Sequence, residues 1–208
     1  MAPGEPFSQR RIGLTGGIAS GKSSVGRWLA QQGLPVLDAD QFAREALTPG
    51  RQATGTVLQR YGSTVRSEGT EAIDRAALGR IVFHDHAERR WLEQLIHPIV
   101  RERFDQSLRL HAETPAVVLM IPLLFEAGLE SLCSEIWLVD CDKSQQLERL
   151  IARDGLSPEA AQARIAAQWP LSRKRVLADH VIANRGQPGA WKAQAVGLLN
   201  ATGTADPG

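Results

Sequence analysis

The chain has 208 residues, of which 43% are hydrophobic and 23% are charged, and its formal net charge is +1. This length suits one packed domain with inserted lobes, and the near-zero charge gives no bulk attraction for nucleic acid. No apolar stretch approaches the length of a membrane span, and residues 1–10 lack the apolar core of a secretory signal. We expect a cytoplasmic protein with small-molecule partners, no nucleic acid and no membrane.

The two cysteines, Cys133 and Cys141, have neither metal-binding nor redox-motif spacing. This pattern is typical of reduced, partly buried thiols in a cytosolic protein.

Near the N-terminus, residues 16–23 read GGIASGKS and match the pattern G-x-x-x-x-G-K-[ST] at every fixed position. The short apolar run at residues 12–15 suits a buried strand, and residues 24–30 have apolar positions at helical spacing. The sequence therefore predicts a strand, a glycine loop and a helix in that order.

Backbone N–H groups in such a loop converge on one point, and the helix N-terminus adds partial positive charge, so the loop predicts a phosphate site. Lys22 is placed to reach the β- and γ-phosphates of a nucleotide, and Ser23 supplies a hydroxyl to Mg²⁺. The alternative is a glycine turn that only closes a strand onto a helix, and the flanking pattern disfavours it.

Short apolar runs recur along the chain with helical patterns between most of them. They lie at Ile12–Thr15, Val36–Ala39, Ala116–Ile121, Glu135–Asp140 and His180–Asn184. This alternation predicts an α/β fold in which a five-stranded parallel sheet is covered by helices and binds ligands at the carboxyl ends of its strands.

Two carboxylates, Asp38 and Asp40, follow the second run. Strand side chains alternate, so we expect both to face the same side, where one activates an acceptor hydroxyl and the other orients Mg²⁺. The alternative is that one of them caps a helix that begins at Gln41. The spacing leaves open which carboxylate has which role.

The interval between the second and third runs is too long for one crossover helix and predicts an inserted helical lobe. Its helical segments are Gln52–Tyr61, Asp74–Phe83 and Ala87–Leu110, the last interrupted by Pro98, which should kink or divide it. His97 either belongs to an acceptor pocket or makes a local hydrogen bond.

After the fourth run, Ser144–Arg153 reads as a helix, Asp154 and Gly155 as a break, and Ser157 as the cap of a second helix. We expect a two-helix lid whose arginines close over ATP. Each arginine has the alternative of a solvated surface ion pair. The candidates are Arg149, Arg153 and Arg164.

The chain resembles the dephospho-CoA kinase family from about Arg11 to Gly186. The resemblance rests on residues 13–18 running into the glycine loop, on Asp38-Ala39-Asp40 with Arg44, on His97-Pro98, on residues 121–126 (IPLLFE), and on residues 146–154, 164–168 and 178–184.

This resemblance implies a single P-loop kinase domain over residues 10–208. Its core is expected at about 10–40, 112–143 and 171–200, its substrate lobe at about 41–111 and its lid at about 144–170. The implied reaction is phosphorylation of the ribose 3′-hydroxyl of dephospho-CoA by ATP with Mg²⁺, the last step of coenzyme A synthesis, in a monomer or weak homo-oligomer.

The resemblance also implies roles for individual residues, with Asp40 as the base. The implied catalytic residues are Asp40, Lys22, Thr15 and Arg149. The implied ATP-binding residues are Gly17, Ile18, Ala19, Ser20, Gly21, Lys22, Ser23, Ser24, Arg149 and Arg153. The implied substrate-binding residues are Asp38, Asp40, Arg44, His97, Leu123, Phe125 and Arg164, and the implied Mg²⁺ ligands are Ser23 and Asp38.

The chain departs from the family pattern at Ala19, where glycine is usual, and at Trp169, where a smaller residue is common. We expect the backbone at Ala19 to have a φ that suits a non-glycine residue.

Two other functions fit parts of the pattern. A nucleoside or nucleotide kinase with a smaller acceptor would share the architecture. A regulatory P-loop switch would carry D-x-x-G and N-K-x-D motifs, which this sequence lacks, and its third strand ends at Ile121-Pro122 without the Walker-B aspartate.

Overall fold

A computed structural model describes residues 9–201. The described chain forms two compact units, a core unit of residues 9–37 and 112–201 and a helical unit of residues 38–111. The end of the expected domain, residues 202–208, lies outside the described residues.

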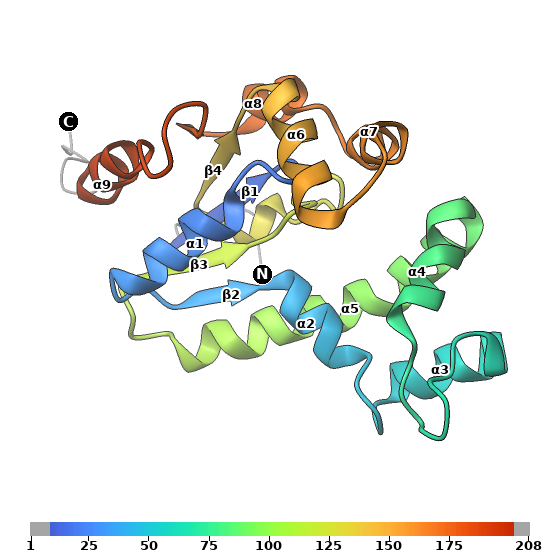
Figure 1. Cartoon of the computed structure of the whole chain (residues 1–208). Helices are drawn as coiled ribbons and strands as arrows, with labels where there is room; N and C mark the ends of the chain where they lie inside the picture. Colours follow the sequence, from blue (N-terminus) through green and yellow to red (C-terminus); the bar gives the residue numbers. More distant parts are fainter. Residues whose placement is uncertain (1–8, 202–208) are drawn as a thin grey trace. The chain divides into compact units, whose positions relative to one another are not determined.

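All five predicted strands are present, with limits within two residues of those expected, and they form one sheet in the order β2-β3-β1-β4-β5 (Figure 1). Strand β1 pairs in parallel with β3 and with β4, and β4 pairs in parallel with β5. The strands are β1 (Arg10–Gly16), β2 (Val36–Asp38), β3 (Ala116–Met120), β4 (Glu135–Asp140) and β5 (His180–Ala183).

Strand β1 is central and lies between β3 and β4, so the connections leave it toward opposite edges of the sheet. In open α/β sheets, ligands bind beyond the carboxyl ends of the strands at the point where the strand order reverses. The glycine loop follows β1 at that point.

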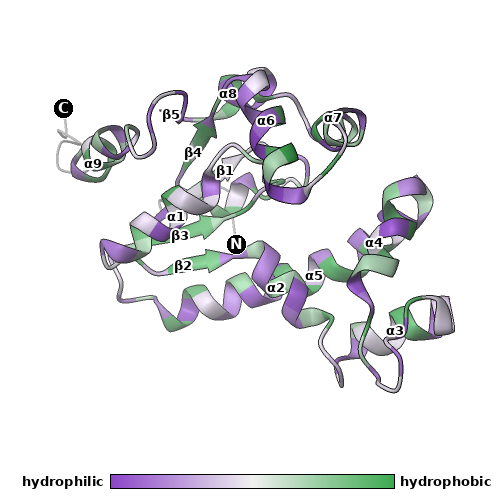
Figure 2. Ribbon diagram, viewed as in Figure 1, coloured by the Kyte–Doolittle hydropathy of each residue, from purple (hydrophilic) through white to green (hydrophobic). Residues whose placement is uncertain are grey.

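One face of the sheet packs under α1 (Lys22–Gln31) and α9 (Lys192–Asn200). Ile12 and Leu14 of β1 point to this face and are fully buried with Val25, Leu29 and other apolar side chains. Figure 2 shows the hydrophobic (green) colouring of β3 and β4, the two strands beside β1. Trp28 and Trp191 meet edge to face with their ring centroids 5.8 Å apart. Burying a side chain such as Leu29 stabilises the fold by about 1.5–3 kcal/mol.

The core unit also holds the expected lid helices α6 (Lys143–Asp154) and α7 (Pro158–Ala166). Gly155 ends α6 in the left-handed conformation, with φ 64°, and the Ser157 hydroxyl accepts the Ala160 N–H at 3.2 Å to cap α7. The sequence had predicted both the break at Gly155 and the cap at Ser157. The unit is completed by α8 (Leu171–Leu177) and the short 3₁₀ helix η2 (Glu130–Leu132).

The helical unit contains α2 (Ala39–Ala46), α3 (Gln52–Tyr61), the 3₁₀ helix η1 (Gly62–Thr64), α4 (Arg75–His84) and α5 (His86–Leu110). Aspartates cap three of its helices, because the side chains of Asp38, Asp74 and Asp85 accept the free N–H groups at the starts of α2, α4 and α5.

The helical unit has a small core of its own around Val57, Leu78 and Trp91. Helix α5 runs through Pro98 as one element, so Pro98 does not divide this helix, and the expected kink stays a prediction. A single lost N–H bond is outweighed in a helix whose buried face includes Ile96, Val100 and Phe104.

Both cysteines are free and buried, as expected. Within residues 9–201, no helix combines the length and the apolar character that crossing a bilayer requires.

Gly13 in β1 is closely packed on the face of the sheet opposite α1 and α9. A Cβ added there would lie 2.5 Å from Cys133 Sγ and 2.9 Å from Leu124 Cδ1. We expect Gly13→Ala to lower the free energy of unfolding by about 1–3 kcal/mol through overpacking. Gly197→Ala is the control, because Gly197 lies in α9 with nothing within 4 Å, and this change should stabilise by about 0.5–1 kcal/mol. Urea titrations that rank the two variants the other way would contradict the packing of β1.

Candidate active site

The glycine loop joins Gly16, the last residue of β1, to Lys22, the first residue of α1. Gly21 has φ 100°, in the left-handed region, and a Cβ there would lie 2.1 Å from Asn184 Nδ2. Gly16 is similarly confined, because a Cβ would lie 2.5 Å from Ser20 Oγ. The fixed glycines of the motif are therefore required by the fold of the loop itself.

Three side-chain amides hold the loop from outside. Gln168 Oε1 accepts the Ile18 N–H at 2.9 Å, and Gln146 Nε2 donates to the Ile18 carbonyl at 2.7 Å. Asn184 Nδ2 donates to the Ser20 carbonyl at 2.8 Å. Sequence reasoning assigned none of these three amides a role, although each lies in a segment that resembles the family. Their spacing from the loop, more than a hundred residues, gave no signal.

Ala19 has φ 58° and is the one non-glycine residue with positive φ among residues 9–201. The expectation that its φ would suit a non-glycine residue was wrong. The turn needs the left-handed conformation at this position whichever residue occupies it, and an L-residue there costs about 1–2 kcal/mol.

A cavity of about 530 Å³ opens beside the loop and the first turns of α1. Arg149 of α6 lines it and donates from Nη2 to the Asn184 carbonyl at 3.1 Å. Arg149 Nη1 is buried and has no hydrogen-bond partner within residues 9–201. The cavity is lined by Gly21, Ser24, Arg27, Trp28, Gln31, Arg149, Asn184, Gly186, Pro188, Gly189, Trp191 and Lys192.

The loop's other candidate side chains differ in exposure. Lys22 is buried, with 8% of its surface exposed, whereas Ser23 and Ser24 in the same helical turn are exposed. Among the described residues, no group of three or more His, Cys, Asp and Glu side chains gathers to hold a metal.

The other two lid arginines pair with one carboxylate. Arg153 donates to both oxygens of Asp154, at 2.7 and 3.0 Å, and Arg164 Nη1 lies 3.1 Å from Asp154 Oδ2. The hydrogen bond from Arg153 lowers the pKa of the Asp154 carboxyl below its ordinary value. In this structure both arginines make the solvated surface ion pairs that were the alternative interpretation, and neither lines the 530 Å³ cavity.

A buried ion pair anchors the segment after β3. Lys174 is fully buried, and its Nζ lies 2.8 Å from Glu126 Oε1 and 3.2 Å from the Pro122 carbonyl. Thr15, also fully buried, donates its hydroxyl to the same Pro122 carbonyl at 3.2 Å. Both printed partners of Lys174 therefore lie in the segment that follows β3.

The segment after β3 also holds two residues expected to bind the substrate, and they differ in exposure. Leu123 is half-buried, whereas Phe125 is only 4% exposed and belongs to the packed interior.

In the helical unit, Asp38 Oδ1 accepts the Asp40 N–H at 2.9 Å and caps α2. Asp40 therefore lies in the first helical turn, and the argument that strand alternation puts both side chains on one side was wrong. The helix starts at Ala39 because Asp38 caps it two residues earlier than expected.

Asp40 and Arg44 line a cavity of about 360 Å³ together with Arg75, whose Nη2 donates to the Arg44 carbonyl at 3.0 Å. The rest of the lining is mainly apolar and comes from α2, α4 and α5. His97 is exposed and is not part of this lining.

A glycine loop at the switch point of a parallel sheet in the order β2-β3-β1-β4-β5, with a cavity beside its helix, defines a P-loop nucleotide-binding protein of the kinase type. The model of the dephospho-CoA kinase family matches residues 10–189. The chain belongs to that family.

Proteins of known sequence or structure are similar to this chain over nearly its whole length. A dephospho-CoA kinase of Synechococcus sp. (strain CC9605) is 85% identical over 206 residues, covering 99% of this chain and 100% of the relative. A crystal structure from Thermus thermophilus has a TM-score of 0.79 at 36% identity, covering 94% of this chain and 99% of that one. A dephospho-CoA kinase structure from Campylobacter jejuni has a TM-score of 0.68 at 29% identity, covering 91% and 94%.

The strained position in the loop gives a stability test. Ala19→Gly relieves about 1–2 kcal/mol of left-handed strain and costs about 0.5–1 kcal/mol of chain entropy, so we expect a net gain of up to about 1 kcal/mol. Ala30→Gly, in α1, is the control and should lose about 1 kcal/mol. Thermal unfolding in which both variants lose equally would contradict the positive φ at Ala19.

Proposed function

We propose that the chain transfers the γ-phosphoryl group of ATP to the ribose 3′-hydroxyl of dephospho-CoA, releasing ADP and coenzyme A. The observation that carries this proposal is the glycine loop at the switch point of the sheet, within a chain matched to the dephospho-CoA kinase family over residues 10–189. ATP and dephospho-CoA are the two substrates of that activity.

The 530 Å³ cavity is where we place the adenine and ribose of ATP. It adjoins Gly21 and Ser24, and its lining includes Trp28 and Trp191, whose apolar rings suit a base. The buried Nη1 of Arg149 supports a ligand here, because an unpaired guanidinium N–H is costly to bury and an anionic oxygen would satisfy it.

We place the phosphates on the loop. Lys22, the N-terminus of α1 and the loop N–H groups other than those of Ile18, Ser20 and Ser24 supply positive charge where the transferring group becomes more negative. Those three N–H groups already donate to Gln168 and to loop carbonyls. Arg149 and, after a change of partner, Arg153 add to this charge. Thr15 has a positioning role in this proposal, because its hydroxyl donates to the Pro122 carbonyl.

We propose that Mg²⁺ accompanies the nucleotide. Mg²⁺ usually takes one or two protein ligands together with phosphates and water, and the exposed hydroxyl of Ser23 suits that arrangement. Asp38 is the second proposed ligand, since its capping bond uses Oδ1 and leaves Oδ2 available. When bound, the ion neutralises charge on the β- and γ-phosphate oxygens.

For the acceptor we propose the 360 Å³ cavity of the helical unit and Asp40 as the base. The 3′-hydroxyl proton passes to the Asp40 carboxylate as the ribose oxygen forms its bond to the γ-phosphorus. The bond from that phosphorus to the β–γ bridging oxygen breaks, and its electron pair leaves on ADP. Arg44 and Arg75 suit the acceptor's phosphates, and the apolar lining suits its pantetheine arm.

Further acceptor contacts are proposed at Leu123, Arg164 and the exposed His97, and a packing role beneath them at Phe125. Residues 41–111 act as the substrate lobe and residues 144–170 as the lid in this proposal, within one kinase domain. The two buried free thiols suit a reducing compartment, so we propose the cytoplasm, and a monomer or weak homo-oligomer.

The test is ADP release with Mg·ATP and four conditions: dephospho-CoA, adenosine, AMP and no acceptor. We expect turnover with dephospho-CoA and one added phosphoryl group in the product mass. Turnover only with adenosine or AMP would assign a sister kinase, and ADP release that ignores the acceptor would refute transfer altogether.

Asp40→Asn tests the base. The amide cannot take the hydroxyl proton, so we expect kcat to fall by about 10²–10⁴-fold while the Kd for ATP stays within about twofold. Asp105→Asn, an exposed carboxylate in the same unit, is the matched control and should leave kcat unchanged. Near-normal turnover in Asp40→Asn would remove Asp40 from this role. Lys22→Ala should abolish transfer.

A further inference from the structure

The core unit contains a second cavity of about 520 Å³ that shares no lining residue with the cavity beside α1. Its walls come from the lid helices α6 and α7, from α8 and from the connection between β4 and α6. The apolar part of the wall is formed by Ile165, Ala166, Pro170 and Leu171. This volume is in the range of small-molecule sites.

The polar end of this cavity carries excess positive charge. Arg175 and Arg185 both donate to the buried Oδ2 of Asp140, Arg175 at 2.7 Å, and Arg185 Nε also lies 3.4 Å from Asp142 Oδ1. Lys143 has no ion-pair partner within residues 9–201. This end therefore has three cationic side chains and only the two carboxylates of Asp140 and Asp142.

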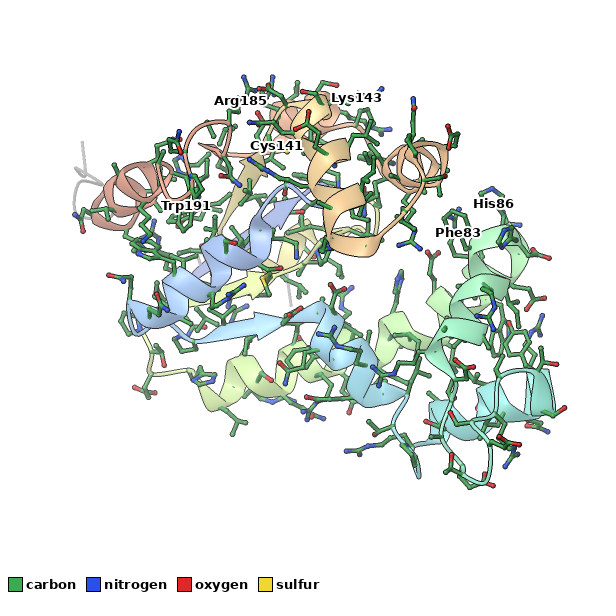
Figure 3. All side chains as sticks on the ribbon, viewed as in Figure 1. Phe83, His86, Cys141, Lys143, Arg185 and Trp191 are labelled. Atoms are coloured by element: carbon green, nitrogen blue, oxygen red, sulfur yellow. The ribbon has the colours of Figure 1, made fainter. Side chains whose placement is uncertain are left out.

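The surroundings of that end favour an anion. Figure 3 shows Cys141, Lys143 and Arg185 around the start of α6. The side chains of Arg175 and Arg185 are more than 40% exposed, and their guanidinium groups keep N–H groups that Asp140 does not use. An anionic group would accept these N–H groups and balance the remaining charge.

The same cavity reaches the glycine loop. Gln146 and Gln168 line it, and they are the two side chains that hold the N–H and the carbonyl of Ile18. Gln146 is buried, with 5% of its surface exposed, and a Cβ on Gly17 would lie 2.5 Å from its Nε2. A molecule in the cavity would therefore contact the two groups that fix the start of the loop.

We propose that this cavity is an effector site for a small amphipathic anion. Its apolar body packs on Ile165 and Leu171, and its charged group meets Lys143, Arg175 and Arg185. Occupation loosens the hold of Gln146 and Gln168 on Ile18 and weakens ATP binding at the loop, and by linkage ATP weakens binding of the anion by the same factor.

The probe for binding is 8-anilinonaphthalene-1-sulfonate, an aromatic sulfonate that becomes fluorescent in apolar sites, titrated into the full-length protein. We expect saturable binding that persists at saturating ATP. Lys143→Gln should weaken it about fivefold or more, and Ala166→Trp, which fills the cavity from an exposed position, should abolish it. Lys192→Gln, on the rim of the other cavity, is the matched control and should bind the probe normally.

Three results would overturn the site. The first is complete displacement of the probe by ATP, and the second is equal binding by Lys143→Gln, Ala166→Trp and the unaltered protein. Loss of binding in Lys192→Gln alone would also overturn it, because the probe would then lie in the other cavity.

The coupling has its own readout. The Kd for ATP, measured by calorimetry, should rise at least threefold at saturating probe, and Gln168→Leu should remove that rise relative to its own value without probe. An unchanged Kd for ATP in the unaltered protein would refute the coupling. This measurement uses binding alone, so it is independent of the acceptor and of the phosphoryl-transfer assignment.

Discussion

The bracing of the glycine loop by remote side-chain amides is the constraint on which the rest of the site depends. A loop of small residues has little packing of its own, and left-handed conformations at Ala19 and Gly21 add strain. Gln146, Gln168 and Asn184 fix three of its peptide groups with charge-neutral hydrogen bonds. Because these partners are neutral, the loop is held without adding a negative group that would repel phosphate. Helix α6, the segment after α7 and the end of β5, which supply these amides, are thereby joined to the loop.

The architecture could be predicted from the sequence because short buried strands and a P-loop are local signals. Strand limits, the cap at Ser157 and the break at Gly155 were all readable from neighbouring residues. The prediction that Asp38 and Asp40 face the same side failed because the cap at Asp38 starts α2 early. Tertiary packing keeps α5 undivided at Pro98, where the sequence had allowed either a kink or a division. The loop's amide braces could not be predicted, since nothing in a single sequence specifies which distant Gln or Asn meets a given peptide.

Lys174 and Glu126 illustrate how charge is used structurally in this fold. Burying an ammonium is costly unless its donors are satisfied, and here a carboxylate and the Pro122 carbonyl both accept from it. Glu126 Oε1 also accepts the Trp169 N–H, at the end of the lid segment. Breaking this pair would leave a buried charge, at a cost of about 3–5 kcal/mol. The pair therefore fastens the residues between α7 and α8 to the segment that follows β3. Trp169, where the family commonly has a smaller residue, takes part in that link through its backbone N–H.

The surroundings of the two cysteines bear on how this protein can be handled chemically. Burial raises the pKa of the Cys133 thiol to about 12 and raises that of Cys141 as well. At neutral pH only about one Cys133 in 10⁵ is then a thiolate, the form that reacts with alkylating and oxidising agents. We therefore expect Cys133 to react slowly with maleimide or iodoacetamide while the chain is folded. Cys141 lines the 520 Å³ cavity, so it is the native thiol to replace before a cysteine on the surface of α7 is used to carry a fluorophore.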